Sequence, residues 1–93
     1  MALLDDAAID ARLGQLDGWT RDGGNITRTF KFDSFMPAIS FVNRVAEAAE
    51  AADHHPDIDV RYSRVTLTLS THSAGGLTHK DFDLAARIDG LID

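Results

Sequence analysis

The chain has no cysteine among its 93 residues. This absence excludes a disulfide, a thiolate metal site and a cysteine nucleophile. Basic residues are also scarce, because 9 Lys and Arg stand against 15 Asp and Glu and give a net charge of −6. The arginines are spread along the chain without a run. Such a chain has no general attraction for phosphate backbones, so direct nucleic-acid binding is not expected.

Long hydrophobic stretches are missing as well. The apolar runs are far shorter than a membrane span, and residues 1–6 lack the basic and apolar parts of a signal peptide. We therefore expect a cytoplasmic protein without a membrane anchor. With 44% hydrophobic and 26% charged residues, the composition is typical of one globular domain, which we place at 1–93.

Hydrophobic periodicity and turn signals predict alternating pairs of strands and single helices. The expected elements are a helix over 5–18, strands over 19–21 and 26–32, a helix over 34–54, strands over 58–62 and 65–72, and a helix from 78 onward. The order predicts an α+β fold whose helices cover one face of a sheet and leave the other face free.

The same periodicity predicts which side chains are buried. In the second helix the expected stripe is Phe35, Ile39, Val42, Val45 or Ala46, and Ala49. Over 58–62 one face carries Ile58, Val60 and Tyr62, and Ser63-Arg64 is the expected hairpin turn. Over 65–72 the helix side receives Val65, Leu67 and Leu69, whereas the open side receives Thr66, Thr68, Ser70 and His72. The last helix is expected to bury Leu84, Ala85, Ile88, Leu91 and Ile92.

Three of the four histidines lie in two short segments, His54-His55-Pro56 and Thr71-His72. Imidazoles exchange protons near neutral pH, so two such segments predict an acid–base site. A histidine at a helix C-terminus also has a purely structural explanation, because it complements the helix dipole. Two adjacent histidines, with a third available at a strand end, favour the acid–base interpretation.

The two adjacent histidines are expected to point in different directions. His54 can remain in helical register and face Glu50, four residues earlier. His55 precedes a proline and is therefore expected to be extended. One of them can then act on a substrate while the other fixes its orientation.

Three histidines together with Glu50 or Asp53 offer the ligands of a zinc site. Ligand pairs are favoured at i, i+4 on helices or i, i+2 on strands, and no His pair has that spacing. We therefore expect no metal and no other cofactor.

Two further residues have structural and functional interpretations. Asp81 follows Thr78 at the spacing of a capping box, which favours a structural role at a helix start. Trp19 suits the edge of a core, although an aromatic ring beside a site also stacks on flat heterocycles.

These motifs resemble the pterin-4a-carbinolamine dehydratases. The resemblance rests on residues 50–56, Tyr62, residues 65–72 and Gly76-Leu-Thr-x-x-Asp81, and it extends back through Gly18-Trp19 and Phe30-x-Phe32-x-x-Phe35. It implies a four-stranded antiparallel sheet with three helices packed on one face. It also implies that the protein removes water from 4a-hydroxytetrahydropterin to give quinonoid dihydropterin and that it uses no metal. This reaction recycles the cofactor of aromatic amino-acid hydroxylases.

The resemblance assigns the site to two segments, 53–56 and 70–72, with a tryptophan nearby. The implied catalytic residues are His54, His55 and His72. The implied substrate-binding residues are Trp19, Glu50, Asp53, Pro56, Ser70 and Thr71. We hypothesise that His54 and His72 transfer the protons, that His55 positions the pterin and that Glu50 orients or charges a histidine. Which histidine is the acid and which the base stays open.

The resemblance also leaves a second class of function open. Members of this family include protein-binding modules, coactivators and assembly factors, so the chain can be a binding module without turnover. The presence of all three motif histidines favours the enzyme. The family further implies a homodimer or homotetramer and a pterin substrate, with an aromatic amino-acid hydroxylase as a possible pathway partner.

Overall fold

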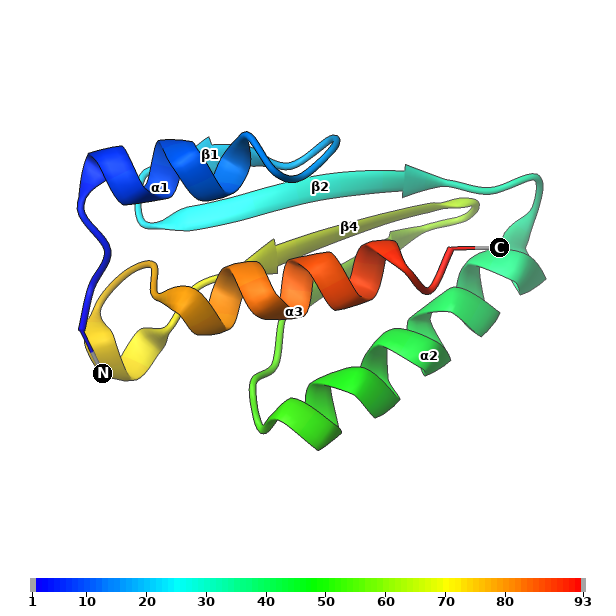
Figure 1. Ribbon diagram of the computed structural model, residues 1–93. Coiled ribbons are helices and arrows are strands. Elements are labelled where there is room, and N and C mark those ends of the chain that lie inside the picture. Colours follow the sequence, from blue (N-terminus) through cyan, green and yellow to red (C-terminus); the bar gives the residue numbers. More distant parts are fainter. Residues whose placement is uncertain (1, 93) are drawn as a thin grey trace.

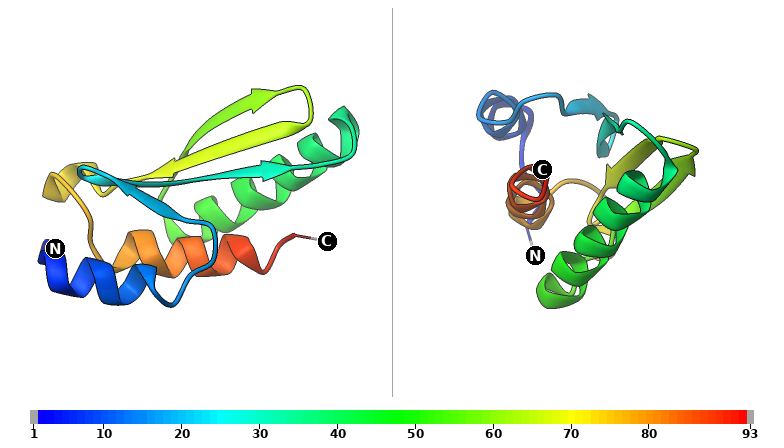
Figure 2. Two further views of the ribbon diagram at one scale, coloured as in Figure 1. Left: turned by 90° about the horizontal axis from the view of Figure 1, so that it is seen from above. Right: turned by 90° about the vertical axis from the view of Figure 1, so that its right-hand side faces the viewer.

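The computed structural model describes residues 2–92 and orders them as helix, strand pair, helix, strand pair, helix (Figure 1). The elements are α1 Asp6–Leu13, β1 Thr20–Asp22, β2 Asn25–Lys31, α2 Phe35–Ala52, β3 Asp57–Arg61, β4 Arg64–Leu69, the 3₁₀ turn η1 His72–Ala74 and α3 His79–Asp89. All strand pairs are antiparallel, in the order β1-β2-β4-β3. The helices lie on one side of this sheet (Figure 2), which confirms the predicted fold class.

The central pair of strands divides the sheet into an apolar and a polar face. Ile26 pairs with Leu69 and Phe30 pairs with Val65, and these side chains are buried under the helices. On the opposite face the hydroxyls of Thr29 and Thr66 lie 2.9 Å apart. The period-two pattern predicted for the last strand is therefore confirmed over β4.

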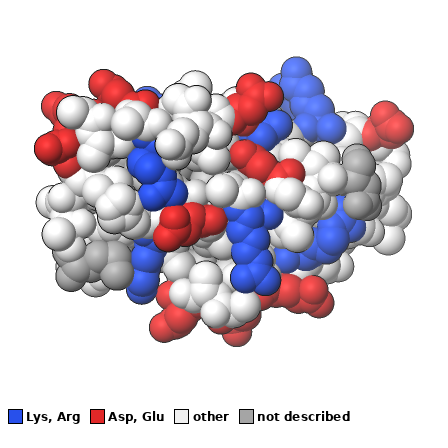
Figure 3. Space-filling view, viewed as in Figure 1, with Lys and Arg blue, Asp and Glu red and all other residues white. Residues whose placement is uncertain are grey.

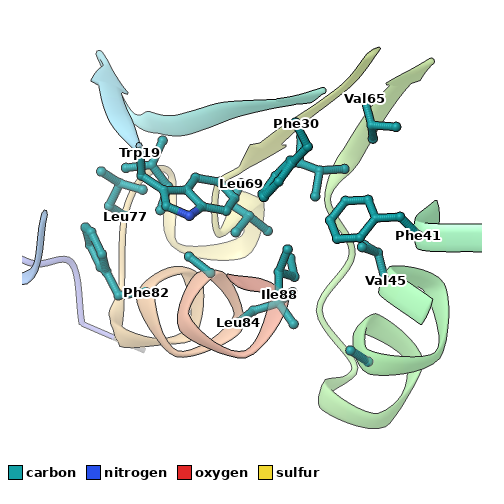
Figure 4. Packing of buried hydrophobic residues seen from close by; sticks show 14 of the residues in the cluster. Trp19, Phe30, Phe41, Val45, Val65, Leu69, Leu77, Phe82, Leu84 and Ile88 are labelled. Atoms are coloured by element: carbon teal, nitrogen blue, oxygen red, sulfur yellow. The ribbon is translucent and has the colours of Figure 1, made fainter. Parts of the chain in front are cut away.

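An aromatic cluster connects the sheet to the helices (Figure 4). The Phe30 and Phe41 rings lie 4.7 Å apart between centroids, and Trp19 meets Phe30 edge-on at 6.1 Å. Phe82 completes the core from α3 and is fully buried. This packing holds α2 and α3 against the sheet and thereby fixes the end of α2 and the start of α3.

The predicted buried stripe of α2 is only partly right. Val45 and Ala49 are buried as expected, but the other buried residues are Ala38, Phe41 and Ala48, whereas Phe35 is 44% exposed. The helix turns its small alanines and one large ring toward the sheet. Phe35, in the first turn of α2, lies outside this core.

The edge of the sheet also departs from the prediction. The β3–β4 hairpin turns at Tyr62-Ser63, one residue earlier than expected, and Tyr62 has a positive φ of 51°. Ile58 is 40% exposed and Tyr62 is 68% exposed, because β3 is an edge strand that the helices cover incompletely. Instead of joining the core, Tyr62 stacks on Phe35 at 6.4 Å between ring centroids.

The remaining helices begin as predicted, and the first ends earlier. The first helix, α1, ends at Leu13 rather than near Gly18. In α3, Leu84 and Ile88 are buried as predicted. Ile92 follows α3 and is 38% exposed, contrary to the prediction. None of the helices within residues 2–92 has the length and apolar character needed to cross a membrane.

Candidate active site

The first histidine segment is shaped by a left-handed residue at the end of α2. Asp53 has φ 49° and ψ 44°, and the His54 N–H donates to the Ala49 carbonyl at 3.1 Å. This conformation reverses the chain direction immediately after the helix, before Pro56 enters β3. As a result, His54 is directed into the protein and His55 toward solvent.

His54 is buried against the first turn of α3. Its side chain is 9% exposed, and its Nε2 lies 2.6 Å from Oδ1 of the fully buried Asp81. The other oxygen of Asp81 accepts from the Thr71 hydroxyl and from the Thr78 N–H, each at 2.9 Å. One carboxylate thus joins the end of α2, the segment after β4 and the start of α3.

These contacts have a defined direction. Because the Thr71 hydroxyl donates to Asp81, the proton between Thr71 and Thr78, 2.8 Å apart, comes from Thr78. An ionised carboxylate only accepts, so the His54 proton lies on Nε2 and its Nδ1 is left as the basic nitrogen. The network fixes both the orientation and the tautomer of this imidazole.

The predicted pairing of Glu50 with His54 is wrong. Glu50 instead contacts Nε2 of His55, and both side chains are largely exposed. The left-handed Asp53 explains the change, because it rotates His54 out of helical register toward α3 and brings His55 over the last turn of α2.

His72 does not stand at the end of a strand as predicted. The strand β4 ends at Leu69, Thr71 forms an isolated bridge with Gly76, and His72 opens the 3₁₀ turn that Gly75 closes at φ 80°. The side chain of His72 is exposed, and within residues 2–92 it has no hydrogen bond or ion pair. It is therefore a free imidazole on a short turn.

The two histidine segments meet at one cleft of about 360 Å³. Its lining consists of Asp53, His54, His55, Ser70, Thr71, His72, Ser73 and Lys80. Glu50 is outside this lining and acts on it only through His55. A larger hollow of about 430 Å³, between the end of β2 and α2, contains no histidine.

Neither Trp19 nor Pro56 lines the cleft. Trp19 is only 5% exposed, lies between the sheet and α3 (Figure 4), and donates from Nε1 to Asp89 at 2.8 Å. In this chain Trp19 is a core residue, and its contact with a substrate stays a prediction. Its indole N–H has a hydrogen-bond partner in the half-buried Asp89, which explains why the ring fits the core.

Sequence reasoning missed three contributors to the site. The capping box of Thr78 and Asp81 was predicted correctly, but not the contact of Asp81 with a histidine 27 positions away. Lys80 and Ser73 also line the cleft. Their only sequence signal is that they are neighbours of motif residues.

The charges around the site are mixed. On the face shown in Figure 3, acidic and basic side chains are interspersed, and neither sign forms a continuous field. The cleft itself contains Asp53 and Lys80 beside its histidines. Across residues 2–92, no cluster of three or more His, Cys, Asp or Glu side chains is arranged to hold a metal ion. The polar lining of the cleft can orient a polar substrate, and its imidazoles can exchange protons.

Fold and site together define a small α+β protein with a cleft lined by three histidines at one end of its sheet. The family described as pterin 4 alpha carbinolamine dehydratase matches residues 2–91. Proteins with the provisional name pterin-4-alpha-carbinolamine dehydratase are 65% identical in Roseiflexus castenholzii, over 98% of both chains, and 60% identical in Nocardia farcinica, over 96% and 94%. The chain belongs to this family.

Solved structures agree with this assignment. A transcriptional coactivator/pterin dehydratase from Brucella melitensis superposes with a TM-score of 0.95 at 36% identity, over 99% of this chain and 100% of that one. A pterin dehydratase-like protein identified as a RuBisCO assembly factor in the alpha-carboxysome gives a TM-score of 0.66 at 24% identity. This superposition covers 80% of this chain and 86% of that one. The second likeness shows a shared fold alone.

Proposed function

We propose that this protein dehydrates 4a-hydroxytetrahydropterin to quinonoid dihydropterin by histidine acid–base catalysis. The observation that carries the proposal is the convergence of His54, His55 and His72 on one cleft, in a chain of the pterin dehydratase family. His55 and His72 are exposed and add nothing to the core, so their position beside the buried His54 favours a chemical role. The reaction needs groups that both give and take protons near neutral pH, and imidazoles do so.

The chemistry requires two proton transfers. The C4a–O bond breaks while a proton is delivered to the departing hydroxyl, N5 loses its proton, and the C4a=N5 double bond forms as water leaves. We assign these transfers to His54 and His72. The Asp81 carboxylate supports His54 as the base, because it stabilises the imidazolium that forms when Nδ1 takes up a proton. His72 then delivers the proton to the hydroxyl, and His55, oriented by Glu50, positions the pterin.

The test is an assay of freshly generated 4a-hydroxytetrahydropterin, compared with its spontaneous dehydration. We expect the wild-type protein to accelerate the reaction and His72→Ala to lower kcat by about 10²-fold. His79→Ala is the matched control, because His79 is exposed, contacts Arg12 and lies outside the cleft. Circular dichroism should show all three proteins folded.

The outcomes separate the enzyme from a binding module. Wild-type rates in both His54→Ala and His72→Ala would refute the assignment of the proton-transfer pair. A folded wild-type protein that leaves the spontaneous rate unchanged would instead favour a protein-binding role. Recycling of tetrahydropterin for an aromatic amino-acid hydroxylase, a cytoplasmic location and a homodimer or homotetramer belong to the same proposal. Light scattering of the purified protein measures the oligomeric state.

A further inference from the structure

A second cleft adjoins the histidine cleft on the side of α3. It has a volume of about 280 Å³ and is lined by Ala52, His54, Lys80, Asp83, Leu84 and Arg87. His54 and Lys80 line both hollows. A ligand with a flat ring at the histidines can therefore extend a substituent past Lys80 along the surface of α3.

The second cleft contains two cations that have no partner in the part of the chain that the structure describes. Within residues 2–92 the side chains of Lys80 and Arg87 make no hydrogen bond or ion pair, although the chain has an excess of acidic residues. The acidic residue beside them, Asp83, is already bound by Arg12 at 2.8 Å. An anion entering this cleft would meet two available positive groups and a neutralised carboxylate.

Helical spacing places these cations on one face. Lys80 and Arg87 are seven residues apart, which is two turns and about 10 Å along the axis of α3. Their long side chains can converge on one anionic group between them, with the guanidinium forming paired hydrogen bonds to its oxygens. Leu84 and Ala52 supply the apolar part of the lining, which suits the carbon chain leading to such a group.

We propose that this second cleft binds the side chain at C6 of the pterin and selects side chains that end in a phosphate or carboxylate. The proposal rests on the proposed function, since it requires the pterin ring to occupy the histidine cleft. Asp53, in the lining of that first cleft, repels an anionic end and so favours the orientation in which this end lies toward Lys80 and Arg87.

Binding of two matched pterins tests the proposal. The probes are 6-(trihydroxypropyl)pterin and its monophosphate ester, followed by quenching of pterin fluorescence at low ionic strength. We expect the phosphate ester to bind about tenfold more tightly, because its phosphate would make charge-assisted contacts with the partly exposed Lys80 and Arg87. Lys80→Ala and Arg87→Ala should each remove most of this difference. Arg64→Ala is the control, because Arg64 is also exposed and unpaired among the described residues but lies in the β3–β4 hairpin, outside both clefts.

The outcomes distinguish this inference from the proposed function. Equal affinity for the two pterins, or a preference that falls equally in Arg64→Ala, would overturn the anion site while leaving the dehydratase intact. A preference that survives in both cleft variants would overturn it as well. If neither pterin binds and the carbinolamine is not dehydrated faster than its spontaneous rate, the proposed function itself fails.

Discussion

Replacement of Asp81 by asparagine tests the buried network most directly. The variant preserves the shape of the side chain but replaces one accepting oxygen with an NH₂ group that donates. If the NH₂ faces Thr71 and Thr78, it meets two donors that need an acceptor. If it faces His54, Nε2 must accept, and the ring changes tautomer. Neither orientation of the amide satisfies all of these partners while His54 keeps its Nε2–H tautomer.

The magnitude follows from the burial of the site. Asp81 is 0% exposed and His54 is 8% exposed, so water cannot replace a lost contact easily. An unsatisfied buried group costs about 1–3 kcal/mol and a hydrogen bond to a charged group contributes about 1.5–3 kcal/mol, so we expect Asp81→Asn to destabilise the fold by about 2–4 kcal/mol. For a domain of this size the Tm should fall by about 10–20 °C.

Activity separates a positioning role from a merely structural one. Measured well below its Tm, Asp81→Asn should lose about 10²-fold in kcat while KM changes little, because the residue acts on His54 and does not touch the substrate. The ¹⁵N NMR spectrum of the histidines should show the Nε2–H tautomer of His54 in the wild type and its loss or mixing in the variant. Asp59→Asn is the control, since that side chain is 56% exposed and lies outside both clefts. A folded Asp81→Asn protein with wild-type kcat and an unchanged His54 tautomer would refute the reasoning.

Three other substitutions give contrasting results. His55→Ala should raise KM more than it lowers kcat. Urea unfolding should show that the free energy of unfolding falls by less than about 1 kcal/mol, because the contact of His55 with Glu50 is exposed. A decrease in kcat as large as that of His72→Ala would contradict the positioning role of His55. Phe41→Ala should cost about 3–5 kcal/mol in the same unfolding experiment, because the ring is fully buried. Phe35→Ala, at a ring that is 44% exposed, should cost far less, and equal losses would contradict the observed orientation of α2.

The fold could be predicted because its strands carry strong local signals. In β4 every second residue is a large aliphatic side chain and the residues between are threonines, so only one register buries Val65, Leu67 and Leu69. The stripe of α2 was less predictable. An alanine-rich helix has small apolar residues on several faces, and packing against the sheet selects the face that carries Phe41.

The site was predictable in its residue types but not in its contacts. Motif spacing identified the histidines of the cleft, yet the partner of His54 depends on a left-handed aspartate, which has no sequence signal comparable to a glycine. The capping box at Thr78 was visible because its residues are close in sequence. That its carboxylate also holds His54 depends on the packing of α3 against α2, which no local pattern describes.

The two proposed proton-transfer histidines differ in how they are held, and this difference leads to a last prediction. Removal of His54 leaves Oδ1 of Asp81 buried without its donor, so His54→Ala should lose about 1–3 kcal/mol of stability together with its activity. His72 is exposed on its 3₁₀ turn without a hydrogen bond inside the described chain, so His72→Ala should lose activity at nearly unchanged stability. Urea unfolding and the dehydration assay on both variants check the contrast. Equal losses of stability in the two variants would contradict this contrast. They would mean either that His72 makes a stabilising contact or that the bond from His54 to Asp81 does not stabilise the fold. A buried base with a fixed tautomer and an exposed acid on a short turn would let the substrate enter past His72 while His54 stays in place.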